Sequence, residues 1–457
     1  MSPYPLSLPD DTQTMKLKRQ NGGTGPFAPD VPQEIVDLII DNLQDDPLAL
    51  RSCALTAHNW VHRSRRHLHS LVRIGEYYVN LRRYASPPVA QYVRSLDLYM
   101  VRTDRGRQRT TTESLWKMVA RFQNLRSLVI RDFEFYRLSP RRSEVLLNIC
   151  SRLRSLELRH VHFADPADFL SLVGACPQLR ALLIEDGHFY SSITRSRAEE
   201  QTSDYLEGCT KHFPGSGLQS LTVGGLNSCY HFETAVDVWV SELTRRGFLR
   251  ELTLSKDSPD DCEDILRAVG SSAIDLRIAR CHTRAEKPAR TGIEHCTNIR
   301  ALSFVTSLVN SPRRSNPAWV IHFLQQLPSP TGSPARTPPP LRSLAFELHW
   351  SDKDSVDVDF LTEVDHILSS RQDAFGGLAE VVFAVHRHLS PKLQLMETPA
   401  GSLPERTLAF KMFLRVCLGT HLKGLVARKG CSVKLVFPND GDVLRVEARK
   451  FGEECKH

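Results

Sequence analysis

The sequence predicts an α/β protein: a small N-terminal helical module followed by a curved solenoid in which short parallel strands alternate with helices. Two observations lead to this prediction. A six-residue pattern, apolar-x-x-apolar-x-apolar, recurs ten times between residues 93 and 383, at steps that average about 32 residues. Segments with the apolar spacing of amphipathic helices lie between the copies. One strand and one helix in each repeat of this length are typical of stacked repeat arrays.

Composition divides the chain into four regions. Residues 1–28 are rich in proline, glycine and polar residues without periodicity, and we expect them to be a disordered leader. Residues 29–75 hold the helical module, 76–440 the repeats and 441–457 a charged tail. Within the repeats, the proline-rich segment 328–340 is expected to be a flexible loop, because it suits neither a helix nor a strand ladder.

The helical module begins with a proline-led helix. Pro32 suits the first turn, where its missing N–H leaves no bond unmade, and Glu34 complements the positive end of the helix dipole. Asp46 followed by Pro47 repeats this start for a second helix. The first helix has two apolar stripes, residues 35, 38 and 39 and residues 36, 40 and 43. A unit of about 40 residues has difficulty burying that much apolar surface by itself, so either the downstream chain or a second protein covers one stripe.

Several features of this module resemble an F-box: the proline-led helix, the second helix with Asp46-Pro47 and Cys53, and the later Trp60. Two positions depart from the family pattern, with Val31 in place of the usual leucine and Ala57 where a cysteine often stands. The resemblance implies docking on a Skp-type adaptor and, through it, on a cullin–RING ubiquitin ligase. Together with the excess apolar surface, it implies adaptor contacts at Val31, Pro32, Ile35, Leu38, Ile39, Leu43, Leu50, Leu55 and Trp60.

The repeat pattern predicts where the strands and helices of the second region lie. Strands are expected at the copies of the pattern, which begin at residues 93, 125, 153, 179, 218, 249, 299, 341 and 378, with a degenerate copy at 273–278. Helices are expected between them, at 113–122, 143–153, 166–176, 234–246, 261–269, 319–327 and 360–370. A closing helix and strand are expected at 408–418 and 432–437.

The six-residue copies resemble leucine-rich repeats, and an F-box followed by such repeats is a known architecture. The resemblance implies parallel strands on a concave face and helices on a convex face. The family's asparagine or cysteine after the third apolar position is mostly absent, so the repeats are irregular. Three residues before the first apolar position, five copies carry an apolar group that we expect to turn into the core: Phe122, Cys150, Cys176, Cys296 and Phe375.

Composition and the N-terminal residues indicate the cellular compartment in which we expect the protein. Apolar residues make up 41% and charged residues 24% of the chain, and the net charge of +7 is modest at this length. Eleven cysteines without close CxxC pairs favour a reduced intracellular compartment. No signal peptide is recognisable, and no uncharged apolar run reaches the ~18–20 residues of a membrane span. We therefore expect a cytoplasmic or nuclear protein.

Motifs of catalytic chemistry are absent from the sequence. It contains no P-loop, no GxGxxG, no HExxH and no GxSxG elbow. The histidine and cysteine spacings match no common zinc pattern. The sequence therefore predicts a protein that is not an enzyme and uses neither a metal nor a cofactor.

The second position of the repeat pattern is arginine in seven copies. Two interpretations remain open: a solvated row whose aliphatic stems cover the strands, or a basic rim that recruits an acidic or phosphorylated partner. Neighbouring strands lie ~4.8 Å apart, so these like charges repel unless water or carboxylates intervene. The residues are Arg94, Arg126, Arg154, Arg180, Arg250, Arg300 and Arg342.

Three functional hypotheses follow from the sequence. The first is a non-catalytic substrate receptor of an SCF-type ubiquitin ligase, in which the module binds the adaptor and the repeats bind an unidentified protein substrate. The second is a repeat scaffold without ligase function, whose F-box-like segment caps the solenoid. The third is a nucleic-acid-binding protein; against it, acidic residues nearly balance the basic ones and no exposed aromatic pattern accompanies the arginines.

Overall fold

The computed structural model describes residues 31–74, 84, 86–99, 113–190, 195–208, 213–224, 230–247, 249–255, 262–270, 275–279, 291–307, 318–328, 341–351, 357–388, 402–438 and 442–446. The expected leader 1–28, residues 329–340 of the expected loop and residues 447–457 of the expected tail lie outside these ranges. The chain divides into two compact units, residues 1–68 and residues 69–457.

Unit 1 is helical. Its helices are α1 (Gln33–Asn42), α2 (Pro47–Thr56) and α3 (His58–Ser70), of which the last two residues belong to unit 2. Pro32 is the N-cap of α1, and the Asp46 carboxylate caps α2 by accepting from the backbone N–H groups of Leu48 and Ala49, each at 3.0 Å. The buried apolar residues of the unit form one small core, made of Val36, Ile40, Leu50 and Cys53.

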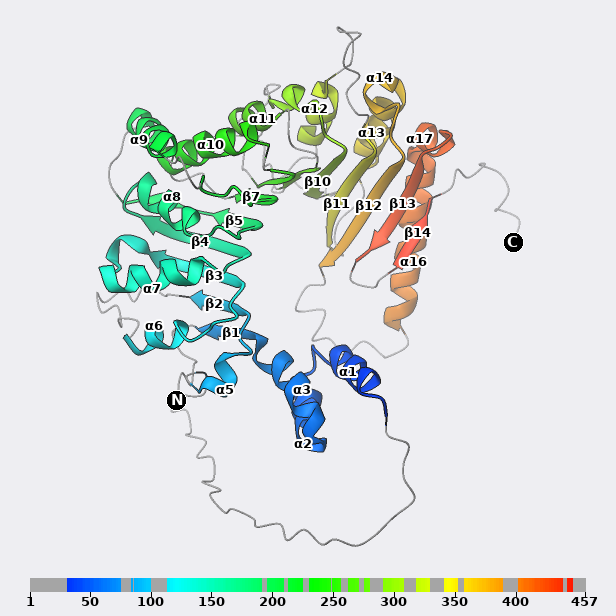
Figure 1. The fold of residues 1–457 in the computed structure, drawn as a ribbon. Helices are drawn as coiled ribbons and strands as arrows, with labels where there is room; N and C mark the ends of the chain where they lie inside the picture. Colours follow the sequence, from blue (N-terminus) through cyan, green and yellow to red (C-terminus); the bar gives the residue numbers. More distant parts are fainter. Residues whose placement is uncertain are drawn as a thin grey trace, which may run out of the picture. The chain divides into compact units, whose positions relative to one another are not determined.

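Unit 2 contains a mixed α/β fold with a 14-stranded sheet of described strands (Figure 1). Each strand pairs in parallel with the next along the chain, except that β6 pairs with β4 and β14 pairs antiparallel with β13. The strands are β1 (Leu71–Ile74), β2 (Ser95–Tyr99), β3 (Ser127–Glu134), β4 (Ser155–Phe163), β5 (Ala181–Glu185), β6 (His188–Phe189), β7 (Ser220–Gly224), β8 (Glu251–Ser255), β9 (Asp275–Ala279), β10 (Ala301–Ser307), β11 (Ser343–Ser351), β12 (Glu380–His388), β13 (Ser432–Phe437) and β14 (Asp442–Arg445).

The helices of unit 2 line one side of this sheet (Figure 1). They are α5 (Pro87–Ala90), α6 (Glu113–Val119), α7 (Pro140–Cys150), α8 (Pro166–Gly174), α9 (Arg195–Gly208), α10 (Tyr230–Arg245), α11 (Glu263–Val269), α12 (Ala318–Gln326), α13 (Val358–Ser370), α14 (Gln372–Phe375), α16 (Ser402–His421) and α17 (Lys423–Ala427), with 3-10 turns at Phe135–Arg137 and Ile293–His295. Strands and helices therefore alternate, and the prediction of an α/β chain with parallel strands is confirmed.

The core of unit 2 consists of rows of apolar residues that run across the strands. The second apolar position of each repeat aligns with its neighbours, as in the pairs Leu96–Leu128 and Leu128–Leu156, and these three side chains are at most 1% exposed. Each such side chain contributes ~1.5–3 kcal/mol on burial. The apolar groups expected at the helix ends are also buried: Phe122, Cys150, Cys176, Cys296 and Phe375.

Candidate functional site

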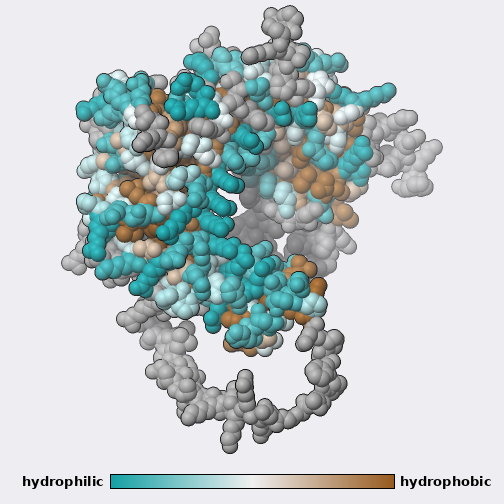
Figure 2. Space-filling view, viewed as in Figure 1, coloured by the Kyte–Doolittle hydropathy of each residue, from teal (hydrophilic) through white to brown (hydrophobic). Residues whose placement is uncertain are grey.

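One apolar stripe of α1 remains exposed to solvent. Ile35, Leu38 and Ile39 are 47%, 59% and 44% exposed, whereas Val36 and Ile40 of the other stripe are buried in the core of unit 1. Further exposed apolar residues of this unit are Val31, Leu48 and Leu55, and brown atoms interrupt the teal surface of the helical unit (Figure 2). We call these six residues, Val31, Ile35, Leu38, Ile39, Leu48 and Leu55, the apolar surface of unit 1.

The remaining adaptor-contact candidates lie elsewhere in unit 1. Pro32 is exposed, while Leu43 and Trp60 are half-buried and pack against the small core. Leu50 is 1% exposed and belongs to that core, so its side chain stabilises the unit and does not contribute to its surface. Leu48 was missed as a candidate, although the signal is simple: it lies seven residues before Leu55, which is two helical turns on the same face of α2.

Polar contacts of α1 explain why this stripe faces outward. The Arg63 Nε on α3 donates to Asp41 Oδ1 at 2.7 Å, and His67 Nε2 lies 2.7 Å from the same oxygen. One turn before Arg63 on α3, Asn59 Nδ2 donates to Gln33 Oε1, at the start of α1, at 2.8 Å. The Arg63 guanidinium and the His67 ring lower the pKa of Asp41. The polar face of α1 thus holds α3 and one apolar stripe fills the core, which leaves the other stripe to solvent.

The sheet of unit 2 carries ion pairs between neighbouring strands on its exposed face. Arg131 Nε on β3 donates to Asp97 Oδ1 on β2 at 3.1 Å. Arg159 on β4 bridges Glu157 of its own strand, at 3.1 Å, and Glu185 of β5, at 2.9 Å. These contacts neutralise the charges on this part of the face.

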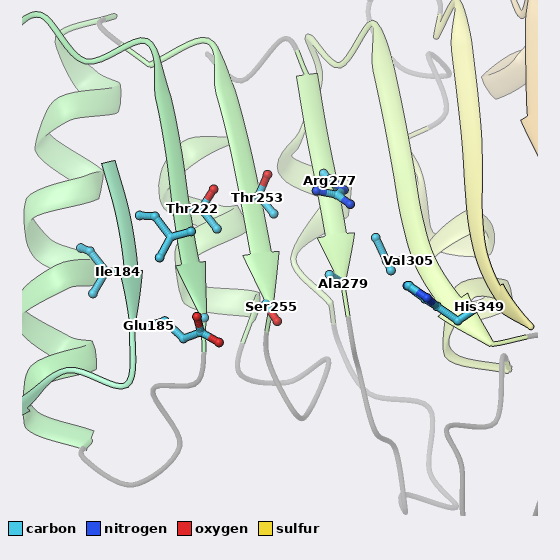
Figure 3. A pocket seen from close by; sticks show the side chains of 11 residues that line it. Ile184, Glu185, Thr222, Thr253, Ser255, Arg277, Ala279, Val305 and His349 are labelled. Atoms are coloured by element: carbon cyan, nitrogen blue, oxygen red, sulfur yellow. The ribbon is translucent and has the colours of Figure 1, made fainter. Parts of the chain in front are cut away.

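A shallow pocket of about 240 Å³ interrupts this pattern farther along the sheet. Between Glu185 on β5 and Arg277 on β9, strands β7 and β8 present uncharged side chains, including the hydroxyl groups of Thr222 and Thr253 (Figure 3). Both flanking charges are paired, Glu185 with Arg159 and Arg277 with Glu347. The part of the pocket between these two charged residues is lined by uncharged side chains. It was missed because no single strand marks it; its signal is threonine at one register position of two adjacent strands, Thr222 and Thr253, next to Arg277 at the same position of β9.

The arginine row lies at the N-terminal edge of the strands. The backbone N–H groups of Arg126, Arg154 and Arg180 donate in turn to the carbonyl oxygens of Arg94, Arg126 and Arg154, at 2.7–2.8 Å. Gln219 then separates Arg180 from Arg250, and Arg342 bonds directly to Arg300. All seven residues precede the first residue of a strand, so they line the edge of the sheet and not the middle of its exposed face.

The described residues contain neither a metal-ligand cluster nor a membrane-spanning helix. They contain no group of three or more His, Cys, Asp or Glu side chains arranged to hold a metal ion. Within the same part of the chain, every helix is too short or too polar to cross a bilayer.

The fold and these surfaces define an α/β protein with a separate helical unit that exposes apolar side chains. Comparison with known proteins adds no closer assignment: no protein-family model matches the chain, and no curated protein matches it.

Proposed function

We propose that this chain is the non-catalytic substrate-recognition subunit of an SCF-type E3 ubiquitin ligase. In this proposal unit 1 is an F-box that binds a Skp-type adaptor, and unit 2 binds the protein to be ubiquitinated. The observation that carries the proposal is the exposed stripe of Ile35, Leu38 and Ile39 on α1. A receptor of this kind acts by raising the effective concentration of its target near the ligase.

The apolar surface of unit 1 supports the adaptor-binding role. Three neighbouring residues of α1 and two of α2 expose large aliphatic side chains, of which Leu55 is 89% and Leu48 71% exposed. Such a cluster is costly in water and is typical of a surface that a second protein covers. Apolar anchors of this type commonly carry most of the binding free energy of an interface.

For unit 2 we propose the finer architecture of an irregular leucine-rich-repeat solenoid. The strict order of parallel neighbours from β1 to β13, with one short side strand, supports it, as does the register in which equivalent residues of successive copies pair. In such an array each repeat contacts mainly its neighbours, and the exposed strand face is available for a partner.

A second function is a repeat scaffold without ligase activity, in which unit 1 serves as the N-terminal cap. The direct continuation of α3 into the first strand, from Ser70 to Leu71, favours this alternative. It predicts that the apolar surface of unit 1 contacts no adaptor.

Co-purification distinguishes the two functions. The tagged full-length chain is expressed in cells and tested for a bound Skp-type adaptor and cullin, as wild type and as Leu38→Asp. The matched control is Leu408→Asp, because Leu408 on α16 is 62% exposed and Leu38 59%. We expect loss of adaptor and cullin with Leu38→Asp alone. Absence of both proteins from the wild-type sample, or equal recovery with all three chains, would reject the receptor function.

A further inference from the structure

Three adjacent arginines form an unneutralised strip along the N-terminal edge of the sheet. Arg126, Arg154 and Arg180 are exposed and lie at the starts of β3, β4 and β5. The backbone N–H of Arg154 donates to the carbonyl oxygen of Arg126 at 2.7 Å, and that of Arg180 to Arg154 at 2.8 Å. Because adjacent strands lie ~4.8 Å apart, the three side chains leave the sheet within about 10 Å of one another.

The charges of this strip contrast with those on the exposed face of the same strands. There, Arg131 is paired with Asp97 and Arg159 with Glu157 and Glu185. No hydrogen bond or ion pair joins the side chains of Arg126, Arg154 and Arg180 to any described residue. The fold thus pairs Arg131 and Arg159 with its own carboxylates and leaves Arg126, Arg154 and Arg180 to solvent.

The turns that lead into these strands strengthen the positive field. Segments 120–126, 150–154 and 175–180 contain five arginines and no aspartate or glutamate. The first residues of the three strands, Ser127, Ser155 and Ala181, are uncharged. Three like charges within about 10 Å repel one another, and an anionic ligand relieves that repulsion on binding.

We infer that Arg126, Arg154 and Arg180 bind a glutamate- or aspartate-rich segment of the protein partner, laid across the starts of β3, β4 and β5. This inference rests on the proposed function of unit 2 as the target-binding part, and it names the chemistry of the target. Side chains on one face of an extended peptide are ~6.8 Å apart, so two or three carboxylates at alternate positions match the length of the strip. Each guanidinium offers a carboxylate two parallel N–H donors.

A peptide fits the strip better than a single-stranded nucleic acid does. Proteins bind single-stranded nucleic acids through aromatic side chains that stack on the bases, together with basic groups that contact the backbone. The exposed Tyr and Phe residues of the described chain, Tyr99, Tyr190 and Phe413, lie outside the three turns, and Phe122 within the first turn is buried. The strip therefore offers charge and hydrogen-bond donors without a stacking platform.

Two matched triple variants test the inference in the full-length protein. The first neutralises the strip (R126Q, R154Q, R180Q), and the second neutralises three paired face arginines (R131Q, R159Q, R277Q), so both lose the same net charge. Binding is measured by fluorescence anisotropy with a short labelled peptide that has glutamate at alternate positions. The same peptide with glutamine, one with phosphoserine in place of glutamate, and a single-stranded oligonucleotide serve as comparison probes.

The expected result is specific to the strip and to carboxylates. The glutamate peptide binds the wild-type protein with an affinity that falls as salt is added, and the glutamine peptide does not bind. The strip variant binds the glutamate peptide about tenfold or more weakly than wild type does. The face variant stays within about threefold of wild type. Equal losses in both variants, no binding of the glutamate peptide, or tighter binding of the oligonucleotide would overturn the inference. Binding of the phosphoserine peptide alone would overturn its assignment to carboxylates.

Adaptor co-purification with the strip variant separates this inference from the proposed function. The three arginines belong to unit 2 and the apolar surface to unit 1, so we expect the strip variant to retain the adaptor. If the strip variant loses the peptide and keeps the adaptor, both proposals stand. If peptide binding behaves as expected but no adaptor is ever recovered, the ligase function fails and the acidic-peptide site remains.

Discussion

The guanidinium group of Arg371 lies at the C-terminal end of α12, where its Nη2 donates to the carbonyl oxygen of Leu327 at 2.7 Å. Its Nη1 donates to the carbonyl oxygens of Leu324 and Gln325 at 2.9 and 2.6 Å. The last carbonyl groups of a helix have no partner within the helix. Because Arg371 follows α13, it ties the end of one helix to the next repeat. Arg428 makes a similar contact, donating to the carbonyl oxygen of Phe375 at 2.6 Å.

We predict that Arg371→Ala destabilises this part of unit 2 by about 2–3 kcal/mol, because it leaves three carbonyl oxygens without their charged donor. Hydrogen exchange of the α12 amides and the thermal unfolding midpoint are the measurements. Arg371→Lys keeps the charge without the planar fork and should fall between alanine and wild type. Unchanged exchange in α12 with Arg371→Ala would contradict the assignment.

Two glycines with the same backbone angle should respond differently to substitution. Gly292 and Gly247 both have φ of +73°, where a side chain is strained. A Cβ atom at Gly292 would lie 2.6 Å from the carbonyl oxygen of Glu263, whereas at Gly247 it would meet nothing within 4 Å. We predict a loss of about 1 kcal/mol for Gly247→Ala from the backbone angle alone, and about 2–4 kcal/mol for Gly292→Ala. Equal denaturation midpoints for the two variants would show that the contact with Glu263 yields easily.

The Asp41–Arg63 pair predicts a pH dependence of unit 1. The folded unit holds the pKa of Asp41 below its usual 3.8, with hydrogen bonds from Arg63 and then His67 as the largest causes. A lowered pKa stabilises the folded state above pH 3.8, and that contribution is lost as the pH falls below this value. Because both side chains are about one-third exposed, we expect Asp41→Asn to cost only about 1 kcal/mol at neutral pH.

The measurement is hydrogen exchange of α1 and α3 amides in the full-length chain between neutral pH and pH 3, corrected for intrinsic exchange rates. The difference between wild type and Asp41→Asn should shrink as the pH falls below 3.8. A difference that stays constant over this range would show that the carboxylate charge is not its source.

Leu38 and Leu50 should separate binding from stability in unit 1. Leu38 is 59% exposed and Leu50 is 1% exposed. If the receptor function is correct, Leu38→Ala weakens adaptor binding by about 2 kcal/mol, roughly 30-fold in Kd, without changing thermal unfolding. Leu50→Ala instead destabilises the unit by about 2–4 kcal/mol through a cavity in the core. Calorimetric titration with purified adaptor and a thermal scan of each variant measure both effects; unaltered affinity with Leu38→Ala would remove this residue from the interface.

The sequence predicted strands β2 to β5 and β7 to β13 because each carries apolar positions that the sheet buries, whereas β1 and the two-residue β6 were not predicted. The copies beginning at residues 125 and 153, for example, became β3 and β4. Helix α9 was not predicted, since its sequence, with two consecutive glutamates followed by glutamine, threonine and serine, has little apolar periodicity. Strand β14, at the start of the 441–457 segment, was not predicted either; it is the last strand of the sheet and pairs antiparallel with β13.

The order of strands and helices could be predicted from local sequence patterns, because apolar periodicity depends only on which nearby residues share a face of one helix or strand. Tertiary structure decided which of the two stripes of α1 is buried, since that choice depends on Arg63 and Asn59, more than twenty residues away. It likewise decided which arginines are neutralised. Arg131 and Arg126 are five residues apart, yet only the first reaches a carboxylate, because strand pairing and not sequence distance sets which charges meet.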